Sequence, residues 1–203
     1  MKNATKHADN LRSLFKKLLK EGKPEPKQAV EPLRALVLGI LSFDTADSRA
    51  QQAMEIIDRE FVDINELRVA TELEVIEIIS PKYPQIEQRA LMFHATLNQI
   101  FEKEHTLSFE RIKTLGKKEA RAMIKELPEM SPFVEGYTTL YGFDSGAIPI
   151  DDSILELLKE SDTIEAETTH DEAQKFIESQ LKADEMYDFY FVARRSVLAK
   201  KAK

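Results

Sequence analysis

Apolar residues recur at three- and four-residue spacing along most of the chain, which is the pattern of amphipathic helices. The segment 85–104 is the longest example, with one apolar face running from Ile86 to Ile100. The segment 30–42 is nearly all apolar, so we expect it to form the most buried helix. Further helices are predicted at 5–21, 45–61, 64–70, 72–79, 108–115, 117–127, 132–142, 152–159, 169–181 and 184–200. The pattern as a whole predicts an all-α protein.

Two of these helices are joined by a very short connection. Pro128 cannot continue the helix before it, because proline lacks the N–H and clashes with the preceding turn. Ser131 and Pro132 form a helix-start signature, a serine N-cap followed by proline at the first helical position. The stretch therefore predicts a helix-hairpin-helix over 117–142, followed by a loop that brings Asp151 to the start of the next helix.

The composition excludes several kinds of disulfide, metal and cofactor site. The chain has 203 residues, enough to bury a sizeable core in one domain or two small lobes. It has no cysteine, which excludes disulfides, thiolate zinc sites and cysteine-ligated iron–sulfur clusters. The four histidines are scattered, so we expect no metal site and no cofactor. No apolar run is long enough to span a membrane and no apolar signal segment is evident, so we expect a cytoplasmic protein that does not bind membranes.

Charge is unevenly distributed. The net charge of −7 is unusual for a nucleic-acid-binding protein. Residues 111–125, however, contain six basic residues and only one acidic residue, and this block directly precedes the hairpin. Two interpretations remain open: a surface that faces the phosphates of DNA, or an ordinary solvated helix face.

The residues around the hairpin resemble a known family. Residues 127–133 (LPEMSPF) and 150–153 (IDDS) are similar to the hairpin and catalytic-aspartate segment of the endonuclease III superfamily of helix-hairpin-helix DNA glycosylases. The family pattern is Leu-Pro-Gly-Val-Gly-x-Lys, a helix, a loop and Val-Asp-Thr-His. Asp151 falls on the family's catalytic aspartate and Phe133 on its catalytic lysine. Glu129 and Ser131 replace the two hairpin glycines.

A second segment supports the resemblance. Residues 40–47 (ILSFDTAD) are similar to the family's Leu-Leu-Ser-x-Gln-x-x-Asp segment, in which the glutamine enters the gap left by the extruded base. Asp44 stands at the position of that glutamine. The likeness extends from about residue 33 to residue 200. It identifies the chain as a divergent relative that lacks both the iron–sulfur cluster and the catalytic lysine.

The resemblance implies a two-lobed, all-α fold. Residues 35–146 would form a six-helix lobe that carries the helix-hairpin-helix. Residues 1–34 and 147–203 would form the second lobe, with Asp151 in the cleft between the two.

The resemblance also implies a function in base-excision repair of duplex DNA, with the chain acting as a monomer. Asp151 would activate a water molecule that hydrolyses the bond to a damaged base. The strand-cleaving lyase reaction of the family's lysine is not available, because Phe133 takes its place. The residues implied in DNA contact are Glu129, Met130, Ser131, Phe133, Asp44, Lys117, Lys118, Arg121 and Lys125.

Alternatives to these roles follow from the residues themselves. Asp151 precedes a helix and is a good N-cap whether or not it is catalytic. Asp44 or Thr45 is in the same way expected to cap the helix that follows them. Glu129 would repel a phosphate by roughly 3 kcal/mol at 5 Å and an effective dielectric of 20. The alternative function is a catalytically inactive descendant that serves as a DNA- or protein-binding scaffold.

Overall fold

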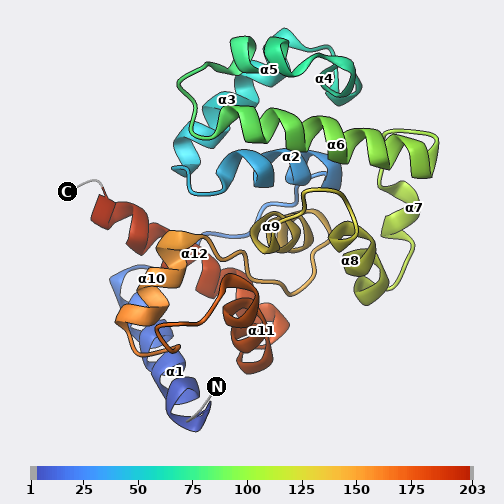
Figure 1. The fold of residues 1–203 in the computed structure, drawn as a ribbon. Coiled ribbons are helices and arrows are strands. Elements are labelled where there is room, and N and C mark those ends of the chain that lie inside the picture. Colours follow the sequence, from blue (N-terminus) through green and yellow to red (C-terminus); the bar gives the residue numbers. More distant parts are fainter. Residues whose placement is uncertain (1–3, 202–203) are drawn as a thin grey trace.

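The computed structural model describes residues 4–201, and these residues form helices joined by loops (Figure 1). The all-α fold expected from the sequence is confirmed. The helices are α1 (Ala4–Glu21), α2 (Pro32–Ser42), α3 (Asp47–Glu60), α4 (Ile64–Val69), α5 (Glu72–Ile79), α6 (Ile86–Glu104), α7 (Glu110–Lys113), α8 (Lys117–Lys125), α9 (Pro132–Gly142), α10 (Asp152–Glu160), α11 (His170–Gln180) and α12 (Ala183–Lys201). Within residues 4–201, no helix has the length and apolar character needed to cross a membrane.

Buried apolar side chains form two separate clusters. The first cluster is built by α2 to α8 and the start of α9, and the second by α1, the end of α9 and α10 to α12. Figure 1 shows α9 lying between the two groups of helices. Helix α2 is the centre of the first cluster, with ten of its eleven residues buried, as its apolar run predicted. Tyr137 of α9 packs against both clusters.

The starts of α9 and α10 follow the local signals in the sequence. The Ser131 hydroxyl accepts a hydrogen bond from the Val134 N–H at 3.2 Å, and Pro132 occupies the first helical position. The Asp151 carboxylate accepts from the Ile154 N–H at 2.9 Å. Each cap satisfies an N–H that has no partner inside its helix. These two contacts fix the hairpin and the position of Asp151.

The predicted cap of α3 was wrong. The N-cap residue of α3 is Ala46, which makes no side-chain capping bond. Thr45 donates to the Phe43 carbonyl at 3.1 Å, and Asp44 accepts from the backbone N–H of Asp152 at 3.1 Å. Both side chains are used by neighbours outside α3, which the local pattern of residues could not reveal.

Helix α9 approaches the second cluster so closely that one position requires glycine. A Cβ atom placed on Gly136 would lie 2.8 Å from Nε2 of Gln174 and 3.0 Å from the carbonyl oxygen of Ile148. A side chain cannot fit against a backbone carbonyl at that distance without moving it. Gly136 therefore sets the distance between α9 and the loop that leads to Asp151.

We expect Gly136→Ala to lower the free energy of unfolding by about 1–3 kcal/mol, although alanine favours a helix interior over glycine. Gly116→Ala is the control for steric space, since a Cβ atom placed on Gly116 would meet no other atom within 4 Å, and its effect should stay below about 1 kcal/mol, the difference between glycine and alanine at the N-cap of α8. Urea unfolding followed by circular dichroism measures both. Equal stabilities of the two variants would contradict the close approach.

Candidate functional site

Asp151 lies at the junction of the two clusters and is completely buried, with 0% of its surface exposed. One carboxylate oxygen accepts the capping bond from the Ile154 N–H, and the other is in contact with Nη1 of Arg194. Both oxygens are therefore engaged by the protein itself. In this arrangement the carboxylate has no contact with solvent. A base that activates water requires such contact.

Arg194 of α12 is the partner that holds Asp151. Its side chain is 4% exposed, and Nε also donates to Asp47 at 3.0 Å. Its Nη2 donates to the carbonyl oxygens of Ser42 at 3.1 Å and Thr45 at 2.5 Å. We call this set of contacts the Arg194 clasp. The clasp joins α12, the start of α10 and the 42–47 loop, and so ties the second cluster to the first.

A cavity of about 600 Å³ lies beside the clasp, between the two clusters. Its walls come from α2, α3, α9, α12 and the linker that precedes α2. Arg194 and Asp47 line it, whereas Asp151 does not. The side chains that give the cavity its character are aromatic: Tyr137, Tyr141, Tyr187, Tyr190 and Phe191.

The aromatic rings form a connected series across the junction. The ring centroids of Tyr137 and Tyr141 are 4.6 Å apart at an interplanar angle of 35°. Tyr187 and Tyr190 meet Tyr141 edge to face, at 5.9 Å and 6.3 Å. Such surfaces favour stacking with planar rings. The volume and lining are therefore suited to a planar heterocycle.

Burial further disfavours ionisation of these tyrosines. It raises the pKa of Tyr137 to about 12 and also raises the pKa of Tyr141 and Tyr190. The phenols remain protonated at neutral pH, so they offer rings and hydroxyl groups but no negative charge.

The hairpin has Glu129 and Ser131 where the pattern of the resembled family has glycines. Glu129 has a φ of 56°, in the left-handed region that glycine adopts easily. Its side chain is exposed, whereas Met130 packs partly buried against the first cluster. Ser131 uses its hydroxyl to cap α9. The hairpin therefore presents a carboxylate to solvent where a phosphate-binding hairpin has no side chain.

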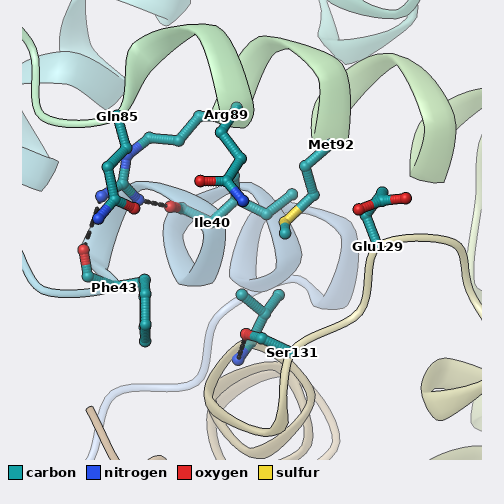
Figure 2. Close-up of a pocket in the computed structure, with 9 residues that line it drawn as sticks. Ile40, Phe43, Gln85, Arg89, Met92, Glu129 and Ser131 are labelled. Carbon is teal, nitrogen blue, oxygen red and sulfur yellow. Dashed lines mark hydrogen bonds between the residues drawn. The ribbon is translucent and has the colours of Figure 1, made fainter. Parts of the chain in front are cut away.

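A small hollow of about 130 Å³ lies between the hairpin and α6. Figure 2 shows Arg89 and Met92 of α6 on one side of it, and Glu129 and Ser131 of the hairpin on the other. Arg89 is buried and donates to the Phe43 carbonyl at 2.7 Å and to the Ile40 carbonyl. Its guanidinium thus supports the end of α2.

Phe133, at the position of the family's lysine, is 1% exposed and belongs to the first cluster. Its ring centroid lies 5.5 Å from that of Phe43. The side chain has no surface to offer to DNA in this conformation. Asp44, by contrast, reaches across the junction to the start of α10, as described above.

Most cations of the basic block already have acceptors. Arg111 pairs with Glu104, Lys113 with Glu110, and Lys125 lies 3.6 Å from Asp171. Lys117 donates to the Asp144 carbonyl at 2.8 Å. Among the described residues, Lys118 is the member of the block without an ion pair or hydrogen bond of its side chain, and it is exposed. The positive charge available to a phosphate is therefore much smaller than the sequence indicates.

Arg121 has a structural role. It contacts Glu135, which is 1% exposed, and donates to both oxygens of Glu178 at 2.8 Å. The Ile148 N–H donates to Glu178 at 3.1 Å, and Gln174 donates to the Ile148 carbonyl at 3.0 Å. This network joins α8, α9 and α11 beside the loop that carries Asp151, so Arg121 is not free to bind DNA.

The tyrosines that line the cavity were not among the site residues expected from the sequence. The tyrosines of α9 and α12 lie at the spacing of apolar helix faces, a pattern that is typical of packing residues. Their hydroxyl groups could have indicated the cavity. Four tyrosines on α9 and α12 carry hydroxyl groups, which an apolar core does not require. Within residues 4–201, no group of three or more His, Asp or Glu side chains is placed to hold a metal ion.

No family model matches the sequence, and no curated protein matches it. Solved structures match its fold. An 8-oxoguanine glycosylase/lyase of Clostridium acetobutylicum in complex with duplex DNA gives a TM-score of 0.75 at 16% identity, covering 98% of this chain and 71% of that one. An endonuclease III trapped as a covalent intermediate with DNA gives 0.73 at 12% identity, covering 92% and 84%.

A third similar structure matches in length as well. The 3-methyladenine DNA glycosylase MagIII of H. pylori, bound to 1,N6-ethenoadenine, gives a TM-score of 0.68 at 17% identity, with 98% of both chains covered. The chain has the fold of the helix-hairpin-helix DNA glycosylases. At these sequence identities the similarity establishes the fold only. The chemistry has to be inferred from the residues of the site.

We expect Asp151→Ala to lower the free energy of unfolding by about 3–5 kcal/mol, because it removes both the cap and a buried partner of Arg194. Asp151→Asn keeps an acceptor for the Ile154 N–H and should cost about 1–2 kcal/mol. The control is Asp152→Ala, whose side chain is 67% exposed and whose effect should stay below about 1 kcal/mol. Thermal unfolding measures the stability of the three variants. An Asp151→Ala variant as stable as the unaltered protein would contradict the structural role of the Arg194 clasp.

Proposed function

We propose that this chain is a DNA-repair protein of the glycosylase type that takes a single base, extruded from duplex DNA, into the tyrosine-lined cavity. The observation that carries the proposal is the cavity itself, with aromatic walls and the Arg194–Asp151 pair beside it. Enzymes that act on a base in duplex DNA must remove it from the stack first. The similar structures, which are DNA glycosylases, support the same function.

Asp151 is the candidate catalytic group. In the proposed reaction its carboxylate activates water and stabilises the positive charge that develops on the sugar. Because Asp151 is fully buried, the reaction requires it to separate from Arg194 when a base enters. Arg194 would keep its contacts with Asp47, Ser42 and Thr45 during that separation. The release of Asp151 therefore leaves the guanidinium with three partners.

The proposed chemistry is hydrolysis of the bond between base and sugar alone. Phe133 supplies no amine, so no Schiff base forms at that position and the strand is not cut through it. The product is a free base and an abasic site.

A second candidate function is binding of DNA without excision. The burial of Asp151 and the engagement of both its oxygens favour it. The two functions differ in one measurable outcome, the release of a base.

Excision is tested on duplexes that each contain one damaged base, including 8-oxoguanine, 1,N6-ethenoadenine and 3-methyladenine. We expect slow release of at least one base, with the strand intact until alkali is added. Asp151→Asn should reduce the rate by about 10²–10⁴-fold, the usual contribution of a positioned base. If neither protein releases a base and both bind the duplexes, the second candidate function holds.

The salt dependence of duplex binding tests which cations meet phosphates. Lys118→Ala should reduce the slope of log K against log salt by about 1, since one phosphate contact contributes about 0.9. Lys113→Ala, whose charge is paired with Glu110 at 2.6 Å, is the matched control and should leave the slope nearly unchanged. Fluorescence anisotropy at several salt concentrations measures both. Identical slopes for Lys118→Ala and the unaltered protein would mean that Lys118 contacts no phosphate and that DNA does not bind at α8.

A further inference from the structure

The Arg194 guanidinium has one more donor than it has acceptors among the described residues. Its five N–H bonds comprise one on Nε, two on Nη1 and two on Nη2. Nε donates to Asp47, and Nη2 donates to two backbone carbonyls. Nη1 donates to Asp151. The second N–H of Nη1 has no acceptor of its own in residues 4–201.

Arg194 lines the tyrosine-lined cavity, whereas Asp151 is not part of its wall. A buried donor without a partner is unfavourable, because it has lost its hydrogen bonds to water. A ligand that carries an acceptor would remove this cost on entering.

We propose that Arg194 determines which bases the cavity accepts, by donating a hydrogen bond from Nη1 to a carbonyl oxygen or ring nitrogen of the base. The inference rests on the proposed function and names the class of substrate: bases with an exposed acceptor. The tyrosine rings add stacking energy, and stacking alone discriminates little between bases.

The clasp makes this donor selective, since Asp47 and the Ser42 and Thr45 carbonyls fix the plane of the guanidinium when a base is bound. A fixed planar donor group recognises acceptors in one direction only. A base of the same shape without the acceptor leaves the N–H unpaired and binds more weakly.

The experiment compares two duplexes that differ in one base. One contains thymine opposite an abasic site, and the other contains 2,4-difluorotoluene, an isostere of thymine with very weak acceptors, at the same position. Neither base then has a pairing partner. We expect the protein to bind the thymine duplex about tenfold more tightly, the effect of one charge-assisted hydrogen bond. Fluorescence anisotropy gives both dissociation constants.

The test variant is Arg194→Met combined with Asp151→Asn, which removes the donor together with the charge that it pairs. Its ratio of the two constants should fall to about one. Arg194→Lys keeps the buried charge but not the planar donor group, and it should reduce the ratio in the same way if the double variant does not fold. Arg59→Met is the control and should keep the ratio, since exposed Arg59 pairs with Glu60 at 2.8 Å and does not line the cavity.

The outcomes separate the inference from the proposed function. Equal affinity of the unaltered protein for the two probes overturns the inference, and so does a ratio that survives the loss of Arg194. Binding of both probes no tighter than an undamaged duplex overturns the proposed function, and the inference with it.

Discussion

The fold depends on how the carboxyl end of α2 is satisfied. The last carbonyls of a helix have no partners inside it, and α2 ends in the interior of the protein. Two buried arginines from distant helices supply the donors. Arg89 of α6 binds the carbonyls of Ile40 and Phe43, and Arg194 of α12 binds those of Ser42 and Thr45. Breaking either set would leave buried polar groups unpaired, so the end of α2 holds α6 and α12 in place.

The same constraint decides the state of the candidate catalytic group. A guanidinium carried into the interior requires negative charge nearby, and Asp151 and Asp47 provide it. The carboxylate of Asp151, at the position that the resemblance assigns to the catalytic aspartate, is therefore structural here. Stability and activity make opposite demands on Asp151, since the buried pair favours the folded state and water activation requires the pair to open. The proposed reaction is slow for this reason.

The sequence predicted what local patterns encode and failed where partners are far apart in the chain. Helix bounds came within a few residues, and the caps at Ser131 and Asp151 were correct, because propensity and capping act over three or four residues. The predicted cap of α3 failed because Asp44 bonds to residue 152, 108 positions away. The use of Arg121 by Glu178 was equally invisible to local reasoning. Of the candidate site, the place of Asp151 at the start of α10 was predictable, and its burial outside the cavity wall was not.

Phe133 shows why the lost chemistry is not recovered by one substitution. Its ring fills space between Phe43 and Tyr137, with centroids 5.5 Å and 6.0 Å away. A lysine at that position would place an ammonium group among aromatic rings in the first cluster, where it would have to be desolvated. The packing of this part of the junction therefore leaves no place for that charge. The cavity and the Arg194 clasp, on the opposite side of Tyr137 in this aromatic series, retain the polar groups on which any surviving chemistry depends.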